Sequence, residues 1–251
     1  MKISGNTILI TGGGTGIGRA LAEALQAEGN EIVIAGRRQS VLDEALKANP
    51  KMKAMVLDIE DPKSIAEFAA KIAEEVPKLN VVIHNAGVMR PESVKATDAK
   101  LVEQTIGINL LGPIRLTAAL LPLLEKQESA TIMTVSSGLA FVPLAMTPTY
   151  CATKAAIHSY TQSLRYQLKD TKIEVLELVP PYVQTELMGE AQAKDPRAMP
   201  LDAFIEETVE ILKTQPEAGE ICVKTVYPLR FAAEGGKYEA FFTGFNDAMK
   251  H

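Results

Sequence analysis

The sequence predicts a single α/β domain built around a parallel β-sheet. Short apolar runs and longer amphipathic segments alternate along most of the 251 residues. The first apolar run leads through a glycine-rich turn directly into a helix, which is typical of nucleotide-binding α/β folds. No linker, internal repeat or low-complexity tract interrupts the alternation, and the length suits one hydrophobic core.

Strands are expected where three to seven mostly apolar residues stand in a row, as in parallel strands buried on both faces. They cover residues 7–10, 32–35, 52–57, 81–83, 131–135, 173–179 and 220–226. Helices are expected where apolar residues recur every three or four positions. One follows the glycine turn to residue 25, and the others cover residues 40–48, 65–76, 98–124, 150–168, 201–213 and 238–251. Gly112–Pro113 predicts a kink in the longest of them.

The composition is that of a soluble globular protein, with 47% apolar and 23% charged residues and a formal net charge of −5. A mildly acidic chain does not favour nucleic acid or an anionic membrane as a partner. The chain shows no signal-peptide pattern, no long uncharged apolar run and only two cysteines. Secretion, membrane insertion and a disulfide framework are therefore not expected, and a cytoplasmic location is.

The glycine-rich turn spans Thr11–Arg19 with the spacing Gly-x-x-x-Gly-x-Gly. Glycines there let a diphosphate approach the backbone, and the N–H groups and dipole of the following helix bind its charge. Arg19 and Ala20 stand where a P-loop needs lysine and serine or threonine, which disfavours nucleoside triphosphate chemistry. The residues expected to contact a dinucleotide are Gly12, Thr15, Gly16, Ile17 and Gly18.

Two arginines, Arg37 and Arg38, follow the second predicted strand. Many dinucleotide-binding folds place a carboxylate at this point to bind the adenosine ribose, but this chain has Gly36 there. A guanidinium can grip a 2′-phosphate that a carboxylate would repel. The sequence therefore favours NADP(H) over NAD(H).

Further cofactor contacts are expected where the third and fourth strands end. The third strand leads into Asp58 and Ile59, and the fourth is followed by Asn85, Ala86 and Gly87. Because the carboxyl ends of parallel strands meet at one edge, these residues should border the same crevice as the glycine turn. No cluster of metal-ligating side chains accompanies them, so no metal site is expected.

Tyr150 and Lys154 are four residues apart at the start of a predicted helix, which places both side chains on nearly the same face. In a partly dry pocket the ammonium favours the phenolate and lowers the pKa of the tyrosine from about 10. Such a phenol can act as an acid or base near neutral pH. Ser136 ends the fifth strand, where α/β sheets present functional groups.

Together these residues resemble the classical short-chain dehydrogenase/reductase family. Its TGxxxGxG and NAG motifs resemble the two turns described above, and its catalytic tetrad is matched by Asn109, Ser136, Tyr150 and Lys154. The resemblance covers at least residues 8–185. It implies a doubly wound, Rossmann-type sheet of seven parallel strands with helices on both faces. It also implies a homodimer or homotetramer that packs through the Asn109 and Tyr150 helices.

The resemblance implies hydride transfer between a nicotinamide and a carbonyl carbon or secondary alcohol, with no metal. Tyr150 would supply or remove the proton, and Lys154 would bind the nicotinamide ribose and lower the pKa of the phenol. Ser136 would hydrogen-bond the substrate oxygen, and Asn109 would hold a water for proton relay. Two other functions remain open: a non-redox enzyme on the same scaffold, such as a dehydratase or epimerase, and a dinucleotide-sensing protein without turnover.

Two features depart from the common family pattern. Pro181 replaces the usual glycine after the sixth strand and has no N–H to donate, so Val183 and Thr185 are expected to carry the nicotinamide contacts in this loop. The C-terminal third, with a substrate flap at about residues 186–200 and a tail at 227–251, most resembles the DltE-like branch. The substrate is expected to be neutral and moderately apolar, because the residues predicted near Ser136 are mostly apolar.

Overall fold

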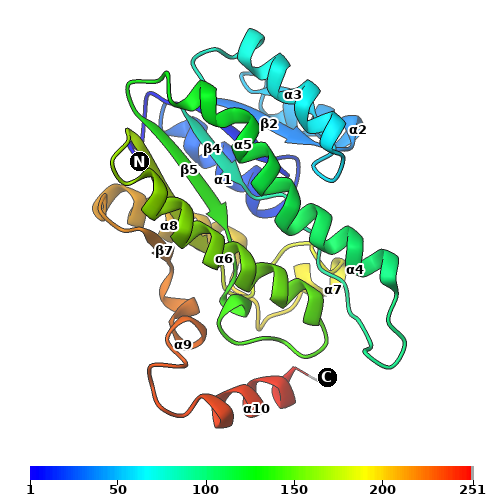
Figure 1. The fold of residues 1–251 in the computed structure, drawn as a ribbon. Coiled ribbons are helices and arrows are strands. Elements are labelled where there is room, and N and C mark those ends of the chain that lie inside the picture. Colours follow the sequence, from blue (N-terminus) through cyan, green and yellow to red (C-terminus); the bar gives the residue numbers. More distant parts are fainter. Residues whose placement is uncertain (250–251) are drawn as a thin grey trace.

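The computed structural model describes residues 1–249 and contains the seven-stranded parallel sheet that the sequence predicts (Figure 1). The strands are β1 (Thr7–Thr11), β2 (Glu31–Gly36), β3 (Lys53–Val56), β4 (Val81–His84), β5 (Ala130–Val135), β6 (Ile173–Val179) and β7 (Glu220–Cys222). Their order in the sheet is β3-β2-β1-β4-β5-β6-β7. The connections reverse direction between β1 and β4, and sheets of this kind bind ligands at that switch point, outside the carboxyl ends of the strands.

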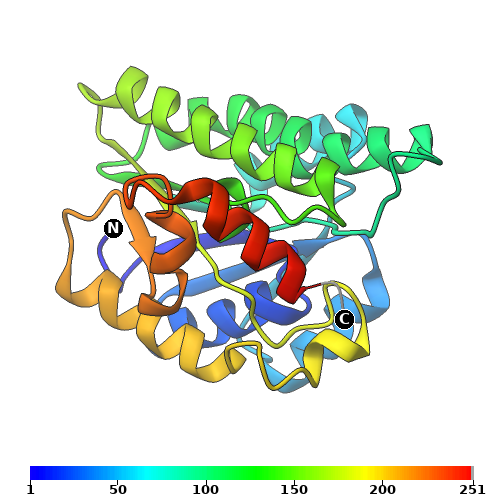
Figure 2. The ribbon, with the colours of Figure 1, turned by 90° about the horizontal axis from the view of Figure 1, so that it is seen from below.

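Helices cover both faces of the sheet (Figure 2). The main ones are α1 (Gly16–Ala27), α2 (Gln39–Ala48), α3 (Pro62–Glu75), α5 (Gly112–Leu124), α6 (Pro148–Leu168) and α8 (Leu201–Thr214). One core packs the sheet against α1, α2 and α8, and the other packs it against α3, α5 and α6. Ile8 and Ile10 of β1 face the first core and Leu9 faces the second, as the two-residue period of a strand requires.

The long helical region predicted over residues 98–124 is one continuous run with a π-helical insert. The helix α4 (Ala99–Ile106) passes through a π turn at Gly107–Leu111 into α5. Pro113 has no N–H, so it cannot make the α-helical bond to the carbonyl of Asn109 four residues earlier. By length and composition alone residues 99–124 could cross a membrane, but 44% of their most apolar stretch is buried in the fold, and core helices of soluble proteins pass the same test.

The strand predicted over residues 220–226 is shorter in the structure. It ends at Cys222 and is followed by a 3₁₀ turn (Lys224–Val226) and the short helix α9 (Tyr227–Arg230). Val223 and Val226 are both fully buried. This spacing fits a tight turn better than a strand, in which side chains three residues apart point to opposite faces.

The flap and the tail each contain a helix. The predicted flap holds the one-turn helix α7 (Glu190–Ala193), and the longest helix in the described part of the tail is α10 (Tyr238–Ala248). Met249 is the C-cap residue of α10, and the last two residues of the predicted tail helix, 250–251, lie outside the described residues. In Figure 1 α10 (red) lies apart from the layers of the sheet, below the N-terminal end of α6.

Candidate active site

The glycine turn lies over the carboxyl end of β1. Gly12 has φ +66°, in the left-handed region that favours glycine, and its N–H donates to the carbonyl of Ala35 at 2.7 Å. A Cβ atom on Gly18 would stand 2.3 Å from the Asn85 amide nitrogen and 2.4 Å from the Gly12 carbonyl oxygen. Only a glycine lets the helix start this close to the neighbouring turn.

The first turn of α1 is open to an anion. Its N-cap residue, Thr15, makes no capping hydrogen bond with its side chain, so the first N–H groups of the helix and its positive dipole end are available. Thr15, Gly16 and Ile17 line a cleft of about 510 Å³. The uncapped N–H groups and the glycines fit the diphosphate of a dinucleotide.

Asn85, Ala86 and Gly87 line the same cleft, directly beside the glycine turn. The Thr11 hydroxyl accepts the N–H groups of Asn85 and Ala86, each at 3.1 Å. The Asn85 amide nitrogen in turn donates to the Thr11 carbonyl at 3.0 Å. These bonds join the two turns into one unit, so a ligand that lies against them meets a preformed surface.

A second cavity of about 360 Å³ adjoins the first at the ends of β2 and β3. Its lining includes the predicted adenosine-side residues Gly36, Arg37, Arg38, Asp58 and Ile59. Both arginines are exposed. Arg90 borders both cavities. It was not predicted to contact the cofactor, and its position three residues after the NAG turn was the available signal.

Tyr150 and Lys154 stand one turn apart on α6 and both line the 510 Å³ cleft. They are 6% and 5% exposed. The Lys154 ammonium lies 5.5 Å from the centroid of the Tyr150 ring and donates to the carbonyl of Val135 at 2.6 Å. The end of β5 thereby holds the ammonium against the sheet.

Burial dominates the electrostatics of this pair. It raises the pKa of Tyr150 above the usual value for a phenol, and a hydrogen bond with Ser137 only partly offsets this. Burial also lowers the pKa of Lys154 to about 8, against the opposing effect of the Glu177 carboxylate. The predicted lowering of the Tyr150 pKa is therefore wrong, because desolvation is the largest effect and the hydrogen bond with Ser137 opposes it only in part.

Ser137, next to the predicted Ser136, is the serine whose side-chain hydrogen bond lowers the pKa of Tyr150. Ser137 is hydrogen-bonded to the phenol, and its Oγ also accepts the Leu139 N–H at 3.1 Å. Ser136 also lines the cleft, but its buried Oγ has no hydrogen-bond partner in the described part of the chain. A spacing of 13 residues to Tyr150, in place of 14, would have selected Ser137.

Asn109 sits in the π turn and is 2% exposed. Its Oδ1 accepts the Val88 N–H, and its Nδ2 donates to the Val88 carbonyl, both at 2.9 Å. Nδ2 also lies 3.2 Å from the Thr153 hydroxyl, next to Lys154. The Asn109 side chain therefore ties the segment after the NAG turn to α6.

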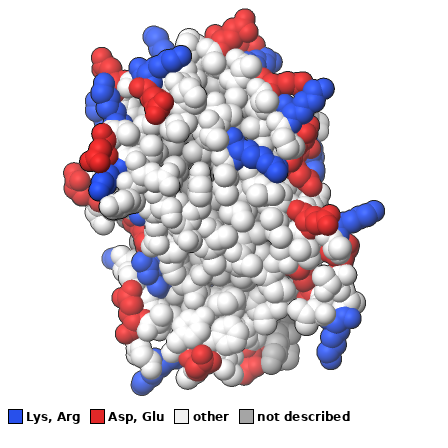
Figure 3. All heavy atoms as spheres, viewed as in Figure 1, with Lys and Arg blue, Asp and Glu red and all other residues white. Residues whose placement is uncertain are grey.

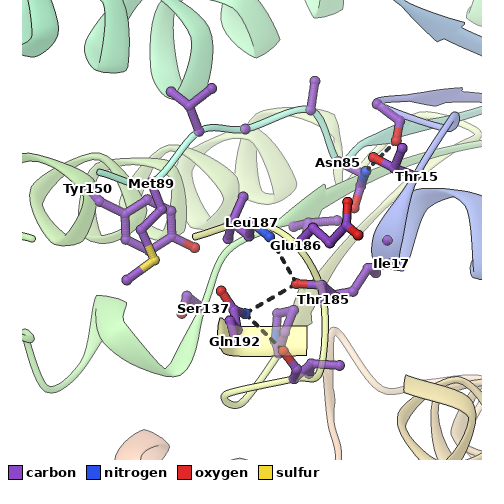
Figure 4. Close-up of a pocket in the computed structure, with 18 of the residues that line it drawn as sticks. Thr15, Ile17, Asn85, Met89, Ser137, Tyr150, Thr185, Glu186, Leu187 and Gln192 are labelled. Carbon is purple, nitrogen blue, oxygen red and sulfur yellow. Dashed lines mark hydrogen bonds between the residues drawn. The ribbon is translucent and has the colours of Figure 1, made fainter. Parts of the chain in front are cut away.

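The loop after β6 closes the cleft from the other side. Figure 4 places Tyr150, Met89 and Ser137 at one end of the cleft and Thr15, Ile17 and Asn85 at the other. Val183 and Thr185, the predicted nicotinamide contacts, line it as well. Gln192 of α7 donates to the Val183 carbonyl at 2.8 Å and to the Thr185 hydroxyl at 3.1 Å. This residue fixes the loop, and no sequence signal identified it.

An apolar cluster borders Tyr150 on the side away from the glycine turn. It contains Met89, Leu144, Tyr150 and Cys151, with Leu139, Met188, Phe245 and Met249 packed against them. Two of these residues, Phe245 and Met249, come from the C-terminal tail, and Asn246 holds the tail helix α10 to the loop that precedes α6. Its Oδ1 accepts the Ala145 N–H at 2.6 Å, and its Nδ2 donates to the Pro143 carbonyl at 3.1 Å. The tail thus contributes to the surroundings of Tyr150, which periodicity could not predict.

Comparison with known proteins agrees with this geometry. Residues 6–196 match the family model described as short chain dehydrogenase. The chain is 39% identical to an uncharacterized oxidoreductase, DltE, of Bacillus subtilis, over 98% of each chain. A Burkholderia cenocepacia short chain dehydrogenase solved in complex with NADP superimposes with a TM-score of 0.80 at 21% identity, covering 97% of this chain and 98% of that one. A Burkholderia phymatum relative solved with NAD gives 0.81 at 20% identity, over 95% and 96%.

Gly18→Ala should destabilise the fold by about 1–3 kcal/mol, because the added methyl overlaps the Asn85 amide and the Gly12 carbonyl. Urea unfolding followed by circular dichroism measures the loss. Gly244→Ala is the matched control: a Cβ there meets nothing within 4 Å, and alanine is the better helix former. Equal stability of the two variants would contradict the close approach at Gly18.

Proposed function

We propose that this chain, which belongs to the short-chain dehydrogenase/reductase family, is an NADP(H)-dependent oxidoreductase acting on a carbonyl or secondary alcohol. The observation that carries the proposal is the buried Tyr150–Lys154 pair facing the same cleft as the glycine turn. A bound nicotinamide supplies or takes the hydride. The chain itself has to hold the cofactor, orient the substrate oxygen and move one proton.

Tyr150 is the proton donor in reduction and the acceptor in oxidation. Its raised pKa keeps the phenol protonated at neutral pH, which suits donation to a carbonyl oxygen as negative charge develops there. Lys154, still largely charged at neutral pH, stabilises the phenolate that donation leaves behind. Ser137, hydrogen-bonded to the phenol, takes the role predicted for Ser136 and donates to the same substrate oxygen.

The carboxamide of Asn109 is occupied by Val88 and Thr153. We therefore assign its side chain to holding the wall of the cleft in place. We propose that the water of the predicted proton relay binds instead to the main-chain carbonyl of Asn109. This carbonyl receives no α-helical hydrogen bond from Pro113, which has no N–H.

Three arginines support NADP(H) as the cofactor. Arg37, Arg38 and Arg90 border the 360 Å³ cavity, and the chain has Gly36 where an NAD(H)-binding fold would place its carboxylate. Guanidinium groups at this place complement a 2′-phosphate. The solved neighbours include one with NADP and one with NAD, so the preference rests on these residues.

The substrate is a neutral, moderately apolar ketone, aldehyde or secondary alcohol. The residues packed around Tyr150 are leucines, methionines and a phenylalanine, supplied by three separate segments and the tail. Residues 186–200 border this region, and we propose that they act as the substrate flap. Such a wall favours an apolar body attached to the reacting oxygen.

A homo-oligomer formed through α5 and α6 suits the surface. Seen in the direction of Figure 1, the face over these helices is nearly free of charged side chains (Figure 3). A contiguous uncharged face of this kind is typical of protein–protein contacts.

We also propose a cytoplasmic location. The two cysteines are free, as is usual in the reducing cytosol.

Tyr150→Phe should lower the turnover of carbonyl reduction by about 10² to 10⁴-fold, because the proton donor is removed. NADPH affinity should stay within about threefold, since the ring and its packing remain. Turnover is followed by nicotinamide absorbance over a carbonyl panel, and affinity by NADPH fluorescence. Wild-type NADPH binding with no net redox of any panel member would favour the dehydratase, epimerase or sensor readings.

Ser137→Ala should reduce turnover by about 10² to 10³-fold, the usual effect of removing one donor to a developing oxyanion. Ser136→Ala is the matched control on the neighbouring residue and should change turnover by less than about fivefold. The same steady-state assay decides between them. A larger loss for Ser136→Ala would instead identify Ser136 as the donor to the substrate oxygen.

Replacing Arg37 and Arg38 together with alanine should weaken NADPH binding by about tenfold or more, since each charged hydrogen bond contributes about 1.5–3 kcal/mol. NADH binding should change by less than about twofold. Parallel fluorescence titrations with the two cofactors measure the difference. Equal losses for both would remove the argument for a 2′-phosphate site.

A further inference from the structure

A row of polar side chains lies between the sheet and α6, directly behind Lys154. In the sheet, Thr134 of β5 is in register with Glu177 of β6, and Glu177 is in register with Glu220 of β7. In-register neighbours point to the same face of a sheet. Opposite them, Lys154, His158 and Arg165 follow one face of α6 at intervals of four and seven residues.

Glu177 is the buried anion of this row. Glu177 is 0% exposed, and the residues on either side of it in β6 are leucines. Both of its carboxylate oxygens contact Nδ1 of His158, at 3.0 and 2.8 Å. Because a carboxylate can only accept, Nδ1 carries a proton and donates it. A carboxylate buried this deeply is costly unless a partner and a nearby cation compensate it.

Both ring nitrogens of His158 have partners. Beyond the Glu177 contact at Nδ1, its Nε2 lies 3.2 Å from the side-chain amide nitrogen of Gln162. These contacts hold the ring against the Glu177 carboxylate and thereby fix where the carboxylate lies.

A metal ion is the competing interpretation of this group. Within residues 1–249, His158, Glu177 and Glu220 offer ligand atoms within 4.8 Å of one another. Glu220, however, already pairs with Arg230 of α9, whose Nε and Nη2 donate at 2.6 and 3.1 Å. A guanidinium thus supplies the cation on the Glu220 side, and Glu177 has the His158 ring, one helical turn from Lys154, as its contact.

We propose that Glu177, held by His158, is a positioning residue whose buried carboxylate stabilises the charged form of the Lys154 side chain, one helical turn from His158. Its part in catalysis rests on the proposed function; its effect on Lys154 does not. The other titratable or charged groups around Lys154 are Tyr150, His158 and Arg165 on α6, Glu220 on β7 and Arg230 on α9. Of all these groups, Glu177 is the one whose charge raises the pKa of Lys154 against the effect of burial.

Glu177→Gln removes the charge while its amide oxygen can still accept from His158. The pKa of Lys154, about 8 in the native protein, should then fall by about one unit, since the neutral amide no longer favours the ammonium. Glu174→Gln is the matched control on the same strand. Glu174 is three residues away and so points to the opposite face; it pairs with the N-terminus.

The direct measurement is an NMR titration of protein labelled with ¹³Cε-lysine, in which Lys154→Met assigns the resonance. A Lys154 pKa that falls in Glu177→Gln and stays constant in Glu174→Gln supports the proposal. An unchanged pKa in Glu177→Gln overturns it, whether or not the protein turns over. His158→Asn, which keeps a donor for Glu177, should preserve the native pKa, and a fall there to the Glu177→Gln value would refute the role of His158 as a holder.

Activity separates this inference from the proposed function. Carbonyl reduction needs the ammonium, so kcat/KM should be full below the Lys154 pKa and lost as the pH rises through it. In Glu177→Gln this alkaline limb should move down by about one pH unit, which lowers kcat/KM about tenfold at pH values above the native limb. A wild type without redox turnover would sink the proposed function alone. A limb that stays in place while the NMR pKa falls would show that Glu177 acts on Lys154 without acting on catalysis.

Discussion

The burial of one ammonium group between α6 and the sheet is the constraint on which the site depends. Lys154 is 5% exposed, and its nitrogen is held by the carbonyl of Val135 at the end of β5. A charge taken out of water is costly unless it is hydrogen-bonded and faces an opposite charge. The position of α6 on the sheet, the end of β5 and the buried Glu177 all meet this requirement. Tyr150, one turn earlier, is carried into the cleft by the same helix.

The fold and most of the cleft followed from the sequence because both depend on local patterns. Apolar runs gave the strand positions to within a few residues, and parallel strands bring their carboxyl ends together whatever their loops contain. The glycine turn and the NAG turn therefore had to meet, and the bonds between Thr11 and Asn85 show how they do. Because Tyr150 and Lys154 are four residues apart on a helix, their side chains had to lie on nearly the same face, however the helix packs.

The rest depended on information that local patterns do not carry. Successive residues of a strand point to opposite faces, so a run of two serines at the end of β5 leaves open which of them meets Tyr150. The pKa of Tyr150 is raised mainly by burial, and the sequence spacing between Tyr150 and Lys154 does not reveal how deeply the phenol is buried. Glu177 stood in a strand identified by its apolar neighbours, and a carboxylate in the middle of such a run was an unused signal. Docking of α10 rests on Asn246, more than 90 residues from its partners.

The central claim is that Lys154 and a bound oxidised nicotinamide together make the Tyr150 phenol acidic enough to exchange a proton. The most direct test is an ultraviolet titration of tyrosinate absorbance, taken as the difference between wild type and Tyr150→Phe so that one of the six tyrosines is isolated. Without cofactor the difference signal should appear only above about pH 10, the ordinary value for a phenol. With saturating NADP⁺ it should move down by at least about two pH units. A signal that stays in place when NADP⁺ binds would contradict the account.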